Sequence, residues 1–189
     1  MDHPETVQMA QWGFIGALAN NKSISPKLYN LPANSAFERP TYRRSLGTNR
    51  CVIPADGFFA WKQVSKKQRI PYYFYFNDRS VFGIAGIWEG YEDMEGNFSR
   101  SFNMMTIDTA ENLSYQEDMP AILKPEQFSQ WLSPETAMES LSEMLGHAGS
   151  RDLQSHPVSP LLINSVSNDP KVIAPTPPSD QFGNYTLFS

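Results

Sequence analysis

The chain has 189 residues, of which 40% are hydrophobic and 13% aromatic, and its formal net charge is −5. This composition indicates a folded globular protein, and the charge excludes a strongly basic nucleic-acid binder. No apolar run approaches the roughly 20 residues of a membrane span, and a single cysteine excludes an internal disulfide. Because the N-terminus lacks the pattern of a secretory signal, we expect one cytoplasmic domain over residues 1–189 with no membrane contact.

Strands are predicted in the first two-thirds of the chain. Residues 51–62 form two strands joined by a turn at residues 55–57. Residues 70–76 and 81–91 are rich in aromatic and β-branched side chains and flank a turn signal, so we expect them to pair as a hairpin. Residues 81–91 should also pair with residues 101–108 across a polar linker. This pattern predicts a mostly antiparallel sheet that curls toward a barrel.

Helices are predicted mainly after residue 109. Residues 124–132 form a short helix with Pro125 at its favoured first position. A second helix starts at Ser133-Pro134-Glu135 and ends at Gly146, with an apolar face formed by Ala137, Leu141, Met144 and Leu145. Residues 151–168 are predicted to be a strand pair, and residues 174–189 a proline-rich tail that need not be ordered. The fold class is therefore α+β, with peripheral helices around a barrel-like sheet.

The positive charge of the chain is concentrated in one segment. Residues 39–69 contain eight basic residues and one acid, Asp56, whereas the chain as a whole has 15 basic and 20 acidic residues. Such an excess is what a phosphate-binding surface requires. The alternative is a hairpin with a solvated lysine turn. Phe58, Trp61 and Tyr72 lie in or beside this segment, where they serve either as core residues or as platforms for unpaired bases.

The remaining reactive side chains indicate neither a metal site nor a nucleophile. Cys51 lies in an apolar strand, where a cysteine is usually an inert small hydrophobe. The three histidines, His3, His147 and His156, are scattered and lack the spacing of metal ligands. The sequence has no phosphate-cradling glycine loop. We therefore expect no metal and no cofactor.

One run of residues identifies a family that this chain resembles. Residues 51–62, Cys-Val-Ile-Pro-Ala-Asp-Gly-Phe-Phe-Ala-Trp-Lys, resemble the signature of the SOS response-associated peptidase family. Other segments follow in the order of that family, over nearly the whole chain: Gln11-Trp12-Gly13-Phe14, Tyr29-Asn30, residues 37–43, residues 84–88, Met105-Thr106, residues 119–123 and His156-Pro157-Val158-Ser159. The resemblance implies the fold of that family and a relation to abasic sites in single-stranded DNA, which its members cap.

The resemblance also implies which residues carry the family's chemistry. An N-terminal cysteine at position 2 attacks the ring-opened abasic sugar, and the same residue carries out the autocleavage. Here that position is Asp2, the catalytic glutamate position is Ala60, and the histidine position is Gln116. Neither alanine nor glutamine can titrate. Of the catalytic set, only Asn30 and Thr106 are retained, so we expect a catalytically degenerate member.

The expected partner is single-stranded DNA. The residues that we expect to contact it are Asn30, Arg39, Arg43, Arg44, Trp61 and Lys62. Relative to the family, the segment before Trp12 is short. Two alternatives stay open: an active crosslinking enzyme and autopeptidase, if a Met-Cys segment lies upstream of Met1, and a noncatalytic scaffold without a DNA role, which the replacements Pro32 and Asp118 favour.

Overall fold

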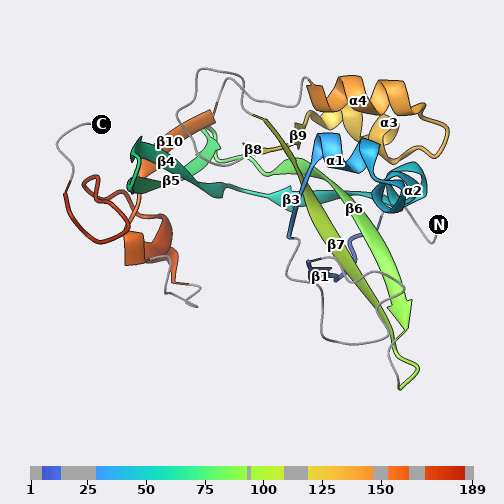
Figure 1. Ribbon diagram of the computed structural model, residues 1–189, viewed down its shortest axis with the longest axis horizontal. Coiled ribbons are helices and arrows are strands. Elements are labelled where there is room, and N and C mark those ends of the chain that lie inside the picture. Colours follow the sequence, from blue (N-terminus) through green and yellow to red (C-terminus); the bar gives the residue numbers. More distant parts are fainter. Residues whose placement is uncertain are drawn as a thin grey trace. The chain divides into compact units, whose positions relative to one another are not determined.

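The chain forms two compact units in a computed structural model (Figure 1). The first unit consists of Met1–Pro54, Phe82–Ile107 and Pro120–Gly149, and the second of Ala55–Val81, Asp108–Met119 and Ser150–Ser189. The structure describes residues 6–13, 29–92, 95–108, 119–146, 153–161 and 169–185. No helix in these described ranges is long and apolar enough to cross a bilayer.

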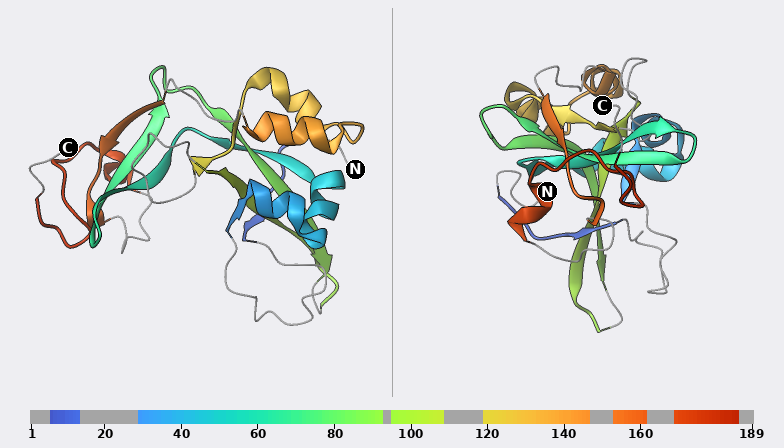
Figure 2. Two further views of the ribbon diagram at one scale, coloured as in Figure 1. Left: turned by 45° about the horizontal axis from the view of Figure 1, so that its top comes forward. Right: turned by 90° about the vertical axis from the view of Figure 1, so that its left-hand side faces the viewer.

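The first unit contains a seven-stranded sheet whose centre is a long hairpin of β6 (Phe82–Glu92) and β7 (Phe98–Ile107) (Figure 2). These strands pair antiparallel with Gly86 opposite Met104, which confirms the predicted pairing of residues 81–91 with residues 101–108. The sheet order is β1-β7-β6-β3, and it is not closed into a barrel. The other strands are short: β1 (Gln11–Trp12), β2 (Asn30–Pro32), β3 (Arg50–Ala55), β8 (Met119–Pro120) and β9 (Ile122–Leu123).

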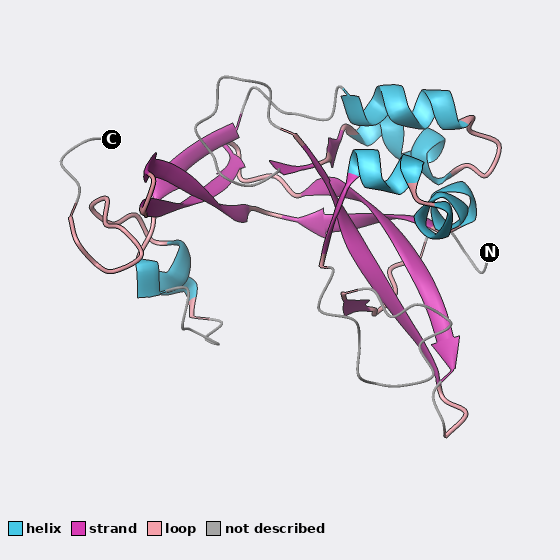
Figure 3. Cartoon of the chain, in the orientation of Figure 1, coloured by secondary structure: helices cyan, strands magenta, loops and turns pink. Residues whose placement is uncertain are grey.

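Helices cover one face of this sheet (Figure 3). They are α1 (Ala33–Glu38), α2 (Pro40–Thr48), α3 (Phe128–Leu132) and α4 (Met138–Gly146), and the 3-10 turn η1 (Pro125–Gln127) precedes α3. α2 begins with Pro40 at its first position, and its buried face repeats at Tyr42 and Leu46, four residues apart, as a helix requires. The helix expected from residue 133 starts instead at Met138, after a turn at residues 134–135.

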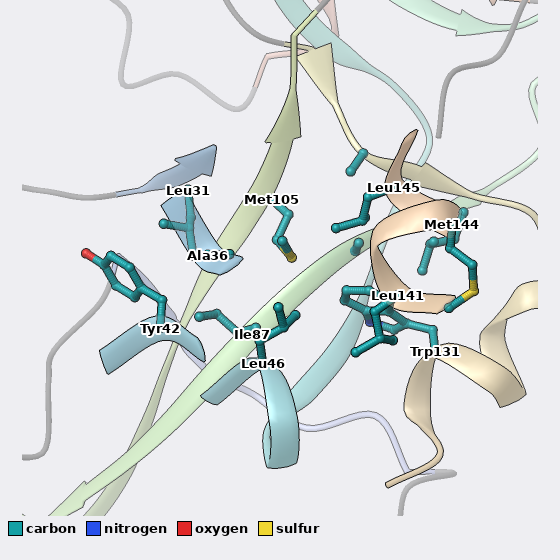
Figure 4. Packing of buried hydrophobic residues seen from close by; sticks show 13 residues of the cluster. Leu31, Ala36, Tyr42, Leu46, Ile87, Met105, Trp131, Leu141, Met144 and Leu145 are labelled. Carbon is teal, nitrogen blue, oxygen red and sulfur yellow. The ribbon is translucent and has the colours of Figure 1, made fainter. Parts of the chain in front are cut away.

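The apolar core of the first unit lies between the helices and the sheet. Figure 4 shows Ile87 and Met105 of the sheet among helical side chains that include Leu46, Trp131 and Leu141. All five side chains are fully buried, and each buried side chain of this kind stabilises the fold by about 1.5–3 kcal/mol. Side chains alternate between the two faces of a strand. Because Met105 points into this core, the other odd-numbered residues of β7 face the core as well, and the even-numbered residues lie on the opposite face.

The second unit contains a three-stranded antiparallel sheet in the order β10-β5-β4. Its strands are β4 (Phe58–Ser65), β5 (Gln68–Phe76) and β10 (Leu153–Pro157). One face of the sheet carries a small apolar cluster of Ala60, Ile70, Tyr72, Phe74 and Met119, with Phe58 and Leu153 packed against it. Phe59, Trp61 and Tyr73 alternate with these residues and therefore lie on the opposite face.

The predicted hairpin of residues 70–76 with residues 81–91 is wrong. β5 pairs with β4 and β10, whereas β6 pairs with β7 and β9 in the other sheet. Residues 77–80 therefore lead from one sheet to the next, and Arg79 takes a positive φ of 58° there. Of the strand pair predicted for residues 151–168, β10 is present, and residues 162–168 lie outside the described part of the chain.

The C-terminal segment contacts the second sheet at several points. It contains the 3-10 turn η3 (Pro170–Ile173) and a bridge between Ser179 and Tyr185. The amide of Thr176 donates to the carbonyl of Pro157 at 3.0 Å, and the amide of Gln181 donates to the carbonyl of Arg69 at 3.1 Å. The sequence did not require the proline-rich tail to be ordered. In the structure, the tail is hydrogen-bonded to β10 by Thr176 and to β5 by Gln181.

Candidate functional site

An aromatic surface lies on the face of the seven-stranded sheet that points away from the helices. The indole of Trp12 in β1 stacks on Phe102 of β7, with ring centroids 6.4 Å apart and an interplanar angle of 4°. Tyr29 meets the same indole edge-on at 5.6 Å. Trp12 is 49% exposed and Tyr29 is 42% exposed. This surface therefore presents flat apolar rings to solvent, which favours stacking with unpaired bases.

Main-chain contacts hold Trp12 in place on this surface. Its indole Nε1 donates a hydrogen bond to the carbonyl of Tyr29 at 3.0 Å, and the amide of Gly13 donates to the carbonyl of Phe102 at 2.9 Å. Gly13 has a φ of +107°, and a Cβ atom there would lie 3.1 Å from the Tyr29 ring. A glycine directly after the tryptophan is therefore required by both the backbone conformation and the close ring.

A cation extends the aromatic surface along β7. The guanidinium carbon of Arg100 lies 4.8 Å from the ring centroid of Phe98 and 5.9 Å from that of Trp88. Phe98, Arg100 and Phe102 are alternate residues and therefore share one face of the strand. Sequence analysis did not select Trp12, Trp88, Arg100 or Phe102 as site residues. The sequence of β7 gave no signal for the last two, because Ser101 and Asn103 are polar but buried, while Phe102 lies on the other face of the strand.

The two retained family positions in the first unit lie in neighbouring strands. β2 runs parallel to β7, with Asn30 opposite Met104 and Pro32 opposite Thr106. Asn30 is exposed, whereas Thr106 is only 2% exposed and buried in the sheet. Asn30 is therefore exposed on the face that also carries Phe102, whereas Thr106 is packed within the sheet.

The basic segment expected to bind phosphate is divided between the units. Arg39, Arg43 and Arg44 are exposed at the junction of α1 and α2 in the first unit. Lys62 and Arg69 belong to the β4–β5 hairpin of the second unit. The structure therefore describes two separate groups of cations.

Arg50, which the sequence counted among the basic residues of this segment, is a structural residue. It is 5% exposed, and burial lowers its pKa. Its guanidinium donates to the carbonyls of Leu46, Gly47, Trp131 and Ser133, at 3.0 Å for Gly47. These carbonyls lie at the ends of α2 and α3, where a helix leaves its last carbonyls without partners. Arg50 therefore joins two helix ends and is not available to a phosphate.

The signature residues of the second unit have different surroundings. Ala60 is 3% exposed and belongs to the apolar cluster. Trp61, on the other face of β4, is half-buried beneath Arg69, whose guanidinium carbon lies 4.5 Å from the ring centroid. The ammonium of Lys62 lies 5.6 Å from the ring centroid of Tyr72. Phe59 and Trp61 therefore face away from the cluster, whereas Phe58 and Ala60 face it.

Comparison with known proteins decides the family. The family model described as SOS response associated peptidase (SRAP) matches residues 1–166. This chain belongs to the SRAP family. It is 33% identical over 165 residues to the abasic site processing protein YobE of Bacillus subtilis, covering 86% of this chain and 73% of YobE. It is 28% identical over 197 residues to the abasic site processing protein HMCES of Mus musculus, covering 87% of this chain and 55% of HMCES.

Solved structures agree with this membership. A protein from Bacteroides thetaiotaomicron superposes with a TM-score of 0.74 at 25% identity, covering 87% of this chain and 75% of that protein. A phage-related protein from Bordetella bronchiseptica shares the fold, with a TM-score of 0.62 at 22% identity over 79% of this chain and 70% of that protein. The predicted family and the predicted α+β fold are both confirmed.

The SRAP positions that the resemblance assigned to catalysis can now be located. Asn30 and Thr106 lie in the first unit, Ala60 lies in the second unit, and Gln116 lies outside the described residues. Burial raises the pKa of Cys51 to about 12, which keeps this thiol protonated near neutral pH. Within the described ranges, no three His, Cys, Asp or Glu side chains gather as metal ligands would.

Proposed function

We propose that this SRAP protein binds single-stranded DNA at abasic sites reversibly and forms no covalent adduct with it. Family membership and relatives named as abasic site processing proteins support a role at such sites. The observation that supports the absence of a covalent adduct is the burial of Ala60 in an apolar cluster.

The surroundings of Ala60 are unsuited to a catalytic carboxylate. Its side chain packs among Ile70, Tyr72, Phe74 and Met119, which together form the buried core of the second unit. An ionised carboxylate in such a place loses its hydration, which raises its free energy. The position that the resemblance assigns to the family's glutamate is therefore part of the core here. With Gln116 at the histidine position, neither proposed acid–base position carries a titrating group.

The exposed aromatic and basic residues support a DNA contact that does not depend on this chemistry. In the first unit, Trp12 and Phe102 offer rings for base stacking, and Arg100 and Asn30 lie on the same face of the sheet. In the second unit, Trp61 and Lys62 are the residues that would contribute. Aromatic faces beside cations bind single strands with little sequence preference. The exposed side chains of Arg39, Arg43 and Arg44 would contact phosphates.

The test measures reversible and covalent binding with the same oligonucleotide. A fluorescent 20-nucleotide strand, intact or with one abasic site, is titrated with the protein and followed by anisotropy, and the mixture is then run on a denaturing gel. We expect a reversible complex that SDS dissociates. Substitution of Trp12 by alanine should weaken binding by about 5- to 150-fold, the range for loss of one base stack.

A matched control uses Leu161→Ala, which removes an exposed apolar side chain from the second unit and should leave affinity unchanged. An SDS-resistant adduct with the abasic strand would contradict the loss of chemistry. Absence of any binding would contradict the DNA role and leave the noncatalytic scaffold as the interpretation of this chain.

A further inference from the structure

Two turns of the second unit border a cavity of about 610 Å³ that is open to solvent. One is the lysine turn, residues 65–68, which joins β4 to β5. The other is the C-terminal turn, residues 179–185. The cavity is lined by Ser65, Lys66, Lys67, Gln68, Asp180, Phe182 and Asn184.

A buried carboxylate organises the C-terminal turn. Asp180 is 0% exposed and accepts hydrogen bonds from the amides of Phe182 at 3.0 Å and Asn184 at 2.9 Å. It also accepts from the side-chain amides of Asn184 at 3.2 Å and Gln68 at 3.1 Å. Gly183 completes the turn with a φ of +85°, a conformation that favours glycine. The negative charge of Asp180 is thus directed into the turn and fully hydrogen-bonded.

Gln181 fixes the C-terminal turn to the lysine turn. Its side-chain Nε2 donates to the carbonyl of Lys67 at 2.7 Å, and its Oε1 accepts from the amide of Arg69 at 2.8 Å. Its own amide donates to the carbonyl of Arg69. The backbones of the two turns are therefore held to each other, and these turns carry Lys66, Lys67 and Phe182 at the cavity.

The side chains presented to solvent at this cavity are two ammonium groups and one aromatic ring. Lys66 and Lys67 are exposed, and neither makes an ion pair with another described residue. Phe182 is 74% exposed although its backbone is hydrogen-bonded to Asp180. Covering such an exposed aromatic ring with a flat partner is favourable, because the contact removes apolar surface from water. Cations beside an exposed ring match the two parts of a nucleotide, its phosphate and its base.

We propose that this cavity is a second contact for single-stranded DNA, in which Lys66 and Lys67 bind backbone phosphate and Phe182 stacks on a base. The inference rests on the proposed function, because it assumes that the chain binds such a strand. Residues 179–185 lie beyond residues 1–166, which the family model matches. Phe182 therefore lies outside the range that the family model matches, whereas Lys66 and Lys67 lie within it. The tail appears beside the β4–β5 hairpin in both views of Figure 2.

The charge and the stacking contributions can be measured separately. The full chain is titrated into a fluorescent 20-nucleotide oligo-dT at several salt concentrations. Replacing Lys66 and Lys67 together by glutamine should lower affinity and reduce the slope of log K against log salt by about 1.4, at about 0.7 per phosphate contact on a single strand. Phe182→Ala should lower affinity by about 5- to 150-fold with an unchanged salt slope.

Two controls match these changes. Lys171→Gln removes an exposed lysine from η3 in the same tail, outside the cavity, and should leave the slope unchanged. Leu161→Ala removes an exposed apolar side chain and should leave the affinity unchanged. If the unmodified chain binds but the cavity variants match their controls, this inference is overturned and the proposed function stands. If the unmodified chain binds neither this strand nor one with an abasic site, both are overturned.

Discussion

Arg69 lies over the indole ring of Trp61, with the guanidinium carbon 4.5 Å from the ring centroid. The two residues belong to the adjacent strands β5 and β4, two positions apart in their register, since Gln63 is opposite Arg69 and Trp61 is opposite Pro71. The guanidinium covers one face of the signature tryptophan. The pair therefore stabilises the hairpin and limits Trp61 to a single face for any base.

Replacing Arg69 by methionine should destabilise the protein modestly. The change keeps the apolar stem and removes the cation, so the free energy of unfolding should fall by about 0.5–1 kcal/mol. Urea denaturation followed by tryptophan fluorescence measures the effect. Arg44→Met, at an exposed position on α2, is the control and should change little. Equal losses in the two variants would show that the stack contributes nothing.

A glutamate at position 60, which the resemblance assigns to catalysis, should destabilise the protein and produce no crosslinking. Ala60→Glu places a carboxylate in the apolar cluster of the second unit, and an unpaired buried charge costs about 3 kcal/mol or more. We expect a lower urea midpoint and no SDS-resistant adduct with an abasic strand. Val64→Glu, at an exposed position of the same strand, should fold normally. A stable Ala60→Glu protein that crosslinks would disprove the view of this site as core.

Arg50→Lys should be more damaging than its conservative appearance suggests. A lysine keeps the charge but cannot reproduce the planar fork that reaches carbonyls of two helices. Several buried carbonyls would then lose their donor, at a cost of about 2–4 kcal/mol in the free energy of unfolding. Chemical denaturation would detect this, with Arg43→Lys on the exposed side of α2 as the control. A change below that of the control would mean that water replaces the guanidinium.

The stability of the C-terminal turn, residues 179–185, should depend on pH. Burial alone would raise the pKa of Asp180, but the hydrogen bonds from Asn184, Gln68 and the Phe182 amide outweigh it, and the pKa lies below its ordinary value of 3.8. A lowered pKa in the folded chain means that the carboxylate stabilises the turn above about pH 4. This stabilisation is lost as the pH falls through the lowered pKa.

The amide signals of Phe182 and Asn184 in NMR spectra report this loss directly. They should stay constant from pH 7 to about pH 4 and then shift as the carboxylate takes up its proton. In Asp180→Asn the same signals should already be displaced at pH 7 and should not titrate. A titration midpoint at or above 3.8 in the unmodified chain would disagree with the hydrogen bonding seen here.

Local patterns were sufficient for much of the first unit. The polar linker between two β-rich runs predicted the β6–β7 hairpin, and the spacing of Leu141, Met144 and Leu145 predicted the buried face of α4. Pro125 marked the start of the helical segment that continues into α3. Each of these features depends on residues close together in the chain, where turn chemistry and side-chain periodicity act directly.

Features made by distant residues could not be predicted in this way. Residues 77–80 do contain a turn, in which the amide of Arg79 donates to the carbonyl of Phe76 at 2.9 Å, but a turn does not specify which strands will pair. Arg50 looks like a surface cation until Trp131, 81 residues later, supplies a carbonyl for it. The contacts of Asp180 with Gln68 and of Gln181 with Arg69 each span 112 residues. The aromatic surface around Trp12 likewise requires β1 to pair with β7.

The position of Gln181 has a practical consequence for work with this protein. β10 covers β5 from Tyr72 to Phe76, and Gln181 supplies partners for Arg69 and Lys67 further along the same side. A polypeptide shortened to the family boundary at residue 166 would leave that stretch of strand bare. An exposed edge strand presents unpaired N–H and C=O groups, which can pair with a strand of another chain. Self-association of such a truncated protein would result from the exposed edge of β5 and would not show that the core is unfolded.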